Sequence, residues 1–168
     1  MKTRKKKTRQ ETYPLRGSTS EPLKVATNLL KIRDRSEQEL RFRLSKRGFG
    51  AEEIDKTINR LRNYGYINDR KLAERLVEYG RREKHLGTRG VVNLLYKRGI
   101  PEEIIEALNL DDPDEVQRAE EFIKKKSVSL MRLPVDKRKR RIYGYLSRRG
   151  YAPWIIKEVI STIEKEDI

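Results

Sequence analysis

The sequence contains no cysteine and a single histidine, His85. Without cysteine, the chain forms no disulfide and has no thiolate ligand for a metal. We interpret the lone His85 as a favourable charge at a helix C-terminus rather than a metal ligand or general base. The glycines form no phosphate-binding loop, and no nucleophile and base are paired. We therefore predict a protein that binds rather than catalyses, without a cofactor or a metal site.

Long apolar runs are also missing. No stretch approaches the roughly 20 apolar residues that span a bilayer, so we expect no membrane association. The basic N-terminus is not followed by an apolar segment, and we expect no secretory signal. Alternating strand patterns are absent as well, which favours an all-α fold. We expect a cytoplasmic monomer.

Basic residues dominate what is present. Lys and Arg number 41 against 26 Asp and Glu, a net charge of +15, while apolar residues make up only 35% of the chain. The low apolar share favours thin helical layers over one thick core. The charge indicates a polyanionic partner: nucleic acid, an acidic membrane surface, or a protein–nucleic acid complex.

A helix-pair unit recurs three times with a period of 51 residues. The motif Leu-x-x-Arg-Gly ends at Gly48, Gly99 and Gly150. Neighbouring columns keep the same register, namely Leu40, Val91 and Ile142, then Ile54, Ile105 and Ile156, then Thr57, Leu108 and Val159. Each unit is predicted to be a helix, a glycine stop, a short turn and a second helix.

Further helices complete the array. One is expected over about residues 23–34, and Ser36 is expected to cap a helix that starts at Glu37. Asn68 or Asp69 caps a third helix after the first pair, and Asp112 precedes another. We expect an elongated, curved array of tandem three-helix repeats. Its parts are a mobile basic arm (1–22), a leading helix plus repeat 1 (23–86), repeat 2 (87–130) and a truncated repeat 3 (131–168).

Two basic residues end the first helix of every unit: Lys46 and Arg47, Lys97 and Arg98, Arg148 and Arg149. Compensation of the helix dipole explains a basic bias at these places. A spaced track that follows a phosphate backbone or an acidic protein groove is the functional alternative. Other candidate partner-binding residues lie in further basic runs: Arg81, Arg82, Lys124, Lys125, Arg138, Arg140 and Arg141.

The basic arm and the aromatic residues leave alternatives open. The arm either contacts phosphates or acts as a solubilising tail. Tyr143 and Tyr145 follow the basic run 137–141 and either stack on bases or pack in the core. Trp154 occupies the column of Glu52 and Glu103; we expect it to pack within the molecule, with contact to a partner as the alternative.

The order of these motifs resembles the RecX family of bacterial regulatory proteins over about residues 23–165. The residues that carry the resemblance are Arg35 to Arg41, Leu44 to Gly48, Leu61 to Asp69, Gly87 to Arg89, Lys97 to Ile100, and Arg149 to Tyr151. The segment Gly65-Tyr66-Ile67-Asn68-Asp69 is similar to a signature of that family. Gly90 departs from the family pattern, in which a basic residue is commoner.

The resemblance implies tandem three-helix repeats that bind the filament of RecA recombinase on single-stranded DNA. Family members lodge in the filament groove and restrain its ATPase, strand-exchange and co-protease activities, and some bind DNA directly. The resemblance also adds Arg89 to the candidate partner-binding residues. The alternatives are a nonspecific protein that acts on single- or double-stranded DNA alone and, with less support, an RNA-binding or ribosome-associated factor.

Overall fold

The computed structural model describes residues 21–166 of the chain, and within this range it contains ten helices and no strand. The helices are α1 Glu21–Ile32, α2 Glu37–Ser45, α3 Ala51–Asn63, α4 Asp69–Arg82, α5 Thr88–Lys97, α6 Glu102–Glu106, α7 Glu115–Lys124, α8 Ser127–Met131, α9 Val135–Arg148 and α10 Pro153–Glu166. Residues 1–20 of the expected basic arm lie outside the described residues, whereas Glu21 and Pro22 already belong to α1.

Local sequence signals set the helix ends. The Ser36 hydroxyl accepts a hydrogen bond of 3.1 Å from the backbone N–H of Glu39, so the predicted start of α2 is confirmed. Asn68 caps α4 in the same manner. Gly48, Gly99 and Gly150 have φ values of 85°, 67° and 79°, the left-handed conformation in which glycine readily ends a helix.

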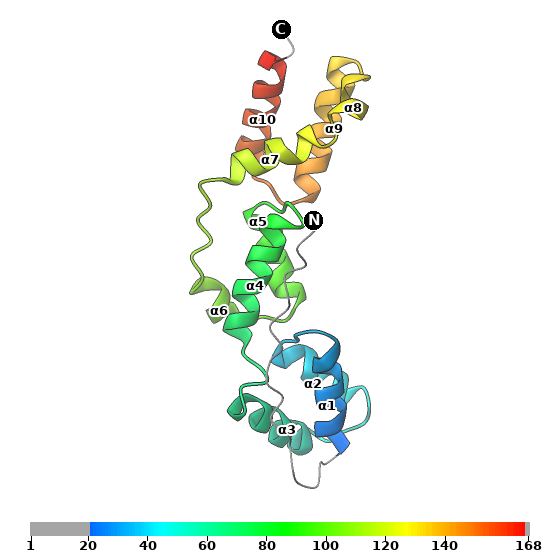
Figure 1. Ribbon diagram of the computed structural model, residues 1–168, viewed down its shortest axis with the longest axis vertical. Coiled ribbons are helices and arrows are strands. Elements are labelled where there is room, and N and C mark those ends of the chain that lie inside the picture. The colour runs from blue at the N-terminus through cyan, green and yellow to red at the C-terminus, as the bar shows by residue number, and fades with distance from the viewer. Residues whose placement is uncertain (1–20, 167–168) are drawn as a thin grey trace, which may run out of the picture.

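The helices pack into three domains that follow one another along an elongated molecule (Figure 1). Helices α1, α2 and α3 surround one apolar cluster, and α4, α5 and α6 surround a second. The third cluster joins α7 and α8 to α9 and α10. The predicted all-α fold of tandem three-helix repeats is confirmed, with each core one helical layer deep.

The grouping of the helices differs from the expected boundaries. Helix α4 was expected to complete the pair before it, yet Leu72, Ala73 and Leu76 pack against Val91 and Leu95 of the pair after it. Helix α7 likewise covers α10, so the third repeat has a leading helix of its own. An apolar stripe shows that a helix is covered but does not identify the neighbour that covers it.

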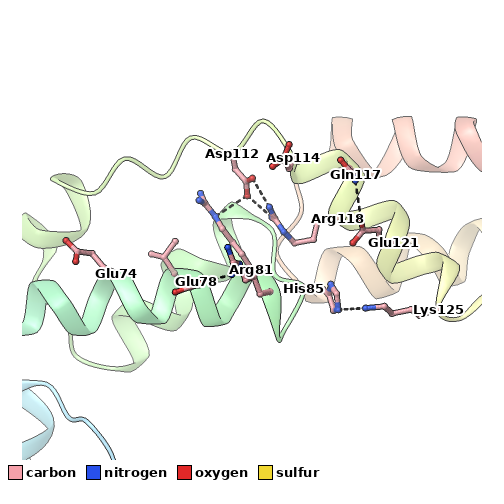
Figure 2. Close-up of a pocket in the computed structure, with 12 residues that line it drawn as sticks. Glu74, Glu78, Arg81, His85, Asp112, Asp114, Gln117, Arg118, Glu121 and Lys125 are labelled. Atoms are coloured by element: carbon pink, nitrogen blue, oxygen red, sulfur yellow. Dashed lines mark hydrogen bonds and ion pairs between the residues drawn. The ribbon is translucent and has the colours of Figure 1, made fainter. Parts of the chain in front are cut away.

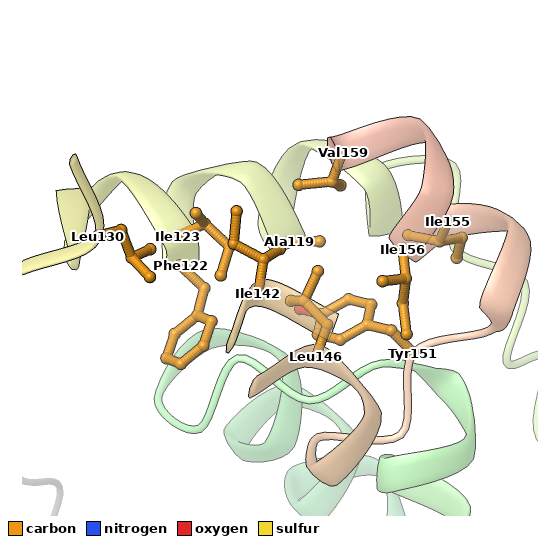
Figure 3. Packing of buried hydrophobic residues seen from close by; sticks show 10 residues of the cluster. All are labelled: Ala119, Phe122, Ile123, Leu130, Ile142, Leu146, Tyr151, Ile155, Ile156 and Val159. Carbon is orange, nitrogen blue, oxygen red and sulfur yellow. The ribbon is translucent and has the colours of Figure 1, made fainter. Parts of the chain in front are cut away.

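The third core shows how a small repeat buries its apolar surface (Figure 3). Ala119 and Phe122 of α7 lie against Ile142 and Leu146 of α9, while Ile156 approaches from α10. The short helix α8, which the sequence did not indicate, adds Leu130 to this cluster. The leading helix α7 therefore contributes to the same core as the repeated pair α9 and α10.

Candidate partner-binding surface

Two of the three repeated Arg-Gly pairs occupy the junctions between repeats. We call residues 47–48, 98–99 and 149–150 the Arg–Gly corners, and residues 33–39 and 84–90 the acceptor segments. Arg98 reaches back to the first acceptor segment: its Nε lies 3.0 Å from Glu39 Oε1, and its Nη2 donates to the Asp34 carbonyl at 2.9 Å. Arg98 and Glu39 are both mostly buried. This corner fastens repeat 2 to repeat 1.

Arg149 makes the equivalent junction between repeats 2 and 3. Its Nη1 donates to the Lys84 carbonyl, and its own carbonyl accepts from the N–H of Gly87 at 3.0 Å. The guanidinium carbon lies 3.9 Å from the centroid of the Phe122 ring, a cation–π contact. The Tyr151 hydroxyl donates to the His85 carbonyl at 3.1 Å. The two junctions therefore share a geometry but differ in chemistry.

Carboxylates from the following repeat cap the acceptor helices. The N–H of Glu37, at the start of α2, donates to Asp69 at 3.0 Å. The N–H and hydroxyl of Thr88, at the start of α5, donate to Glu115 at 2.8 and 2.7 Å. Asp69 and Glu115 each begin a leading helix of the next repeat. A negative group at a helix N-terminus satisfies free N–H donors and the helix dipole, so both contacts stabilise the junctions.

Glycine allows the second junction to close tightly. A Cβ on Gly90 would lie 2.1 Å from the Arg149 carbonyl oxygen, and a Cβ on Gly150 would lie 2.5 Å from the Gly90 Cα. No side chain fits between these backbones. The departure of Gly90 from the family pattern therefore has a local cause, since repeat 3 rests directly on this residue.

The first residue of each basic pair points to solvent. Lys46, Lys97 and Arg148 are exposed, one in each repeat. Lys46 lies over the Phe42 ring at 4.8 Å and Arg148 over the Tyr145 ring at 5.5 Å. Of the second residues, Arg98 and Arg149 serve the junctions, while Arg47 is exposed. The three pairs thus contribute four accessible cations.

Basic side chains also gather on α9, around a shallow pocket of about 360 Å³ lined by Leu133, Lys137, Arg140 and Arg141. Arg138 lies beside them and approaches the sulfur of Met131 at 3.4 Å. Lys139 pairs with Glu164 at 2.6 Å. Three guanidinium or ammonium groups therefore converge on one pocket at the start of α9, a composition suited to an anion.

Three other candidate cations, Arg81, Arg82 and Lys125, line a groove between α4 and α7 (Figure 2). Arg81 lies 3.1 Å from Asp112 and donates to the Leu110 carbonyl at 2.7 Å, so it holds the α6–α7 linker. Arg82 pairs with Glu78 on its own helix at 3.0 Å. Lys125 Nζ lies 2.9 Å from His85 Nε2, and Lys124, on the same helix end as Lys125, is exposed.

Asp112 forms ion pairs with two arginines in this groove. Its side chain is 5% exposed and accepts from both guanidinium nitrogens of Arg118, at 2.6 and 2.7 Å. Burial opposes its ionisation, but the hydrogen bonds from Arg118 and the charges of Arg118 and Arg81 outweigh that effect and lower the carboxyl's pKa. The groove thus contains a structural ion cluster that ties α4 to α7.

His85 does not have the predicted role of a charged helix end. It follows the end of α4 with a φ of 47°, and burial together with the charges of Lys125 and Arg149 lowers its pKa. A histidine with a lowered pKa is neutral at pH 7 and adds no favourable charge. The interpretation from sequence is wrong, because burial and the cations of another repeat both oppose the protonation of His85.

Two further candidates lie on the surface. Trp154 is 62% exposed, so the expectation that it packs within the molecule is wrong. Arg89 is exposed at the start of α5. Tyr143 is also exposed, whereas Tyr145 packs edge-on against Phe122. Trp154 and Tyr143 are therefore available to a partner.

Sequence reasoning missed the acids that make the junctions, namely Glu39, Asp69, Glu115 and Asp112. One signal was available: the period aligns the corner at Arg98 with the one at Arg149, and a buried arginine needs an acceptor. No two of these four acids stand one repeat period apart, so the register could not identify them.

These features define an all-helical repeat protein with a basic, multi-site surface. Residues 23–61 match the family model for RecX, first three-helix domain, and residues 113–160 match that for RecX, third three-helix domain. The chain belongs to the RecX family.

The relatives are proteins of similar length. A regulatory protein RecX of Trichlorobacter lovleyi is 33% identical over 139 residues, which cover 80% of this chain and 90% of that protein. One from Thermotoga petrophila is 37% identical, with 87% and 86% covered. The crystal structure of RecX from Lactobacillus salivarius has a similar fold, with a TM-score of 0.72 at 22% identity over 86% of this chain and 95% of that one.

Within residues 21–166, the structure contains no group of three or more acidic or histidine side chains arranged to hold a metal ion. In the same range, no helix combines the length and apolar character that a bilayer crossing requires.

Proposed function

We propose that this protein binds the filament that RecA recombinase forms on single-stranded DNA. It restrains the filament's ATPase, strand-exchange and co-protease activities and has no catalytic activity of its own. Membership of the RecX family supports this function. The observation that carries the mechanism is the recurrence of Lys46, Lys97 and Arg148 at one place in three consecutive repeats. Action in the cytoplasm follows from this partner.

The mechanism is bridging between neighbouring filament subunits. An elongated array with one exposed cation in each repeat suits a helical groove that has DNA inside and acidic protein walls. Contacts to several subunits at once raise the effective affinity and hold those subunits in one arrangement. A filament held in this manner cannot pass through the changes that accompany ATP hydrolysis.

The test measures recombinase ATPase on single-stranded DNA against increasing amounts of the protein. We expect inhibition well below one molecule per recombinase subunit. Inhibition only when the DNA is saturated would instead indicate competition for DNA.

A charge-reversal variant tests the basic track. Lys46→Glu, Lys97→Glu and Arg148→Glu together avoid Arg98 and Arg149, whose loss would disturb the junctions. The matched control reverses Lys24, Lys71 and Lys157, exposed lysines with one in each repeat. We expect the first variant to lose inhibition and the control to keep most of it. Equal inhibition by the two variants would show that the track mechanism is wrong.

The second candidate is a nonspecific DNA-binding protein that acts on DNA alone. The pocket formed by Leu133, Lys137, Arg140 and Arg141, with the exposed Tyr143 on the same helix, favours it. Its signature is tight binding to naked DNA, with an affinity that falls steeply as the salt concentration rises.

A further inference from the structure

The Arg–Gly corner of repeat 1 has no acceptor segment in the described part of the chain. At repeats 2 and 3 the same corner is seated on the repeat before it, through Arg98 on Glu39 and Asp34 and through Arg149 on Lys84. No described repeat precedes repeat 1. Within residues 21–166, the first repeat therefore carries an unseated copy of the array's own docking element.

The free copy retains the conformation of the seated ones. Gly48 has a φ of 85°, close to the 79° of Gly150, but nothing lies within 4 Å of a Cβ built on it. Arg47 is exposed and has no partner among residues 21–166. The residue that follows is also less covered, since Phe49 is half-buried whereas Ile100 and Tyr151 are each 3% exposed. The corner is formed before anything binds it.

The seated corners define the chemistry of the missing acceptor. Both meet the N-terminal turn of a helix and donate to a main-chain carbonyl just before it. The first also meets Glu39, an acid in the first turn of α2. A guanidinium donates to both groups at once, because its fork carries five N–H donors. The shared acceptor is thus a helix N-terminus, and the junction at Arg98 adds a first-turn carboxylate.

Neither another copy of the chain nor its own N-terminal segment fits this description. The third acceptor position, at the start of α9, has one acid, Asp136, but five consecutive basic residues follow it, Lys137 to Arg141, and their charge repels Arg47. Residues 1–16 hold seven basic residues and one acid, Glu11. A foreign protein helix is the occupant that can supply both the carbonyl and the carboxylate found at the Arg98 junction, which the phosphates of DNA do not.

We propose that the corner at Arg47 and Gly48 docks onto the acidic N-terminal turn of a helix on the partner protein, as Arg98 and Gly99 dock onto α2. This inference rests on the proposed function, in which the partner is the recombinase subunit at one end of the bound array. The corner fixes the array's polarity in the filament, because among the described repeats it is unseated at the first repeat alone.

A pair of single reversals tests the docking geometry. Arg47→Glu is expected to raise the concentration for half-inhibition of recombinase ATPase about ten-fold, the loss of one charge-assisted contact. Lys46→Glu carries the same charge change one residue away and is expected to raise it at most about five-fold. Arg47→Lys keeps the charge but loses the fork, and is expected to lie between Arg47→Glu and wild type. Unchanged urea midpoints verify folding.

A cross-link identifies the occupant. Because the chain has no cysteine, Ser45→Cys gives a single exposed site on α2 for a photoactivatable maleimide. On filaments assembled with recombinase and single-stranded DNA, we expect the label to attach within the first turn of an acidic recombinase helix. Attachment to DNA, to residues 1–20 or to a second copy of the chain would overturn the proposal.

The outcomes also separate this inference from the function it rests on. If wild-type protein does not inhibit the recombinase, the proposed function fails. If wild type inhibits but Arg47→Glu and Lys46→Glu act equally, the function stands and the docking corner is refuted.

Discussion

One residue type in one column has two structural roles in this protein. Arg98 and Arg149 are fastened to the repeat before them, while Arg47 is exposed. Their sequence contexts are nearly the same, so the difference comes from the neighbour that each corner has. A repeat motif can therefore serve assembly in the middle of an array and recognition at its end.

This difference makes a matched pair of substitutions informative. Arg98→Ala removes the contacts with Glu39 and the Asp34 carbonyl, and we expect it to lower the free energy of unfolding by about 1–2 kcal/mol. Arg33 still pairs with Glu39, which limits the loss. Arg47→Ala should change the free energy by less than about 0.5 kcal/mol. Urea unfolding measures both, and equal effects would contradict the assignment of Arg98 to a junction.

His85 predicts a dependence of stability on pH. Its pKa in the folded protein lies below the 6.5 of an unperturbed histidine, because burial and the charges of Lys125 and Arg149 oppose protonation. The unfolded chain therefore binds the proton more readily, so stability decreases as the pH falls below about 6.5 and is unaffected by this group above it. As the only histidine, it can be tested alone.

The comparison uses wild type and His85→Asn, since asparagine tolerates the positive φ. Urea midpoints between pH 7.5 and 5.5 should decrease for wild type and stay level for the variant. If the urea midpoints of wild type and variant changed with pH in the same way, His85 would not be the group responsible.

At the scale of helices, α5 and the turn after α9 approach without a side chain between them. Gly90→Ala would place a Cβ 2.1 Å from the Arg149 carbonyl oxygen, and repeat 3 would have to shift. We expect a loss of about 1–3 kcal/mol in the free energy of unfolding. Helix propensity alone predicts that Gly90→Ala stabilises the protein, because alanine is more favourable than glycine within a helix.

Gly144→Ala is the control in α9. Its Cβ would meet only the flexible end of Arg148, at 3.2 Å, so a gain of about 0.5–1 kcal/mol is expected. Thermal unfolding of the two variants shows whether each substitution raises or lowers the stability of the protein. A stabilising Gly90→Ala would mean that the junction tolerates a wider spacing.

The helices themselves were largely predictable, because caps and glycine stops act locally. Ser36, Asn68 and Gly48 each end or begin a helix as their sequence context indicates. The partner of each leading helix was not predictable, since the stripe of Leu72, Ala73 and Leu76 suits either neighbouring pair. The linkers between the helices decide which pair each leading helix packs against.

For the whole molecule, the contact between repeats 2 and 3 also depends on Asp112. Its carboxylate, almost fully buried, neutralises Arg81 and Arg118 on two repeats. Asp112→Ala leaves two guanidinium groups facing each other, at a cost of up to about 3–5 kcal/mol. Because repeats stabilise their nearest neighbours, we expect faster amide hydrogen exchange in α7 and α10 and unchanged exchange in α1 to α3.

Asp114→Ala is the control for this variant, because Asp114 is an exposed acid in the same linker. It should leave the exchange of α7 unchanged. Uniformly faster exchange throughout the Asp112→Ala protein would indicate one cooperative unit instead of coupled repeats.

The candidate binding surface was only partly predictable from the sequence. The 51-residue period identified six basic residues at equivalent positions. It could not show that Lys97 faces solvent whereas Arg98 contacts Glu39. Trp154 was identified as an exception in its column, and only the fold decided that it is exposed. Burial depends on contacts between repeats, which a periodic sequence pattern does not specify.

The difference in chemistry between the two junctions has a consequence for assembly during folding. Repeat 3 could meet repeat 1 before repeat 2 has folded, since all corners share one shape. Glu39, however, stands in the column where Gly90 admits the Arg149 carbonyl, so its side chain would obstruct that approach. Tandem repeats are prone to misassembly and to domain swapping between neighbours. In this chain, we expect the missing side chain at Gly90 to favour the seating of repeat 3 on repeat 2 over repeat 1.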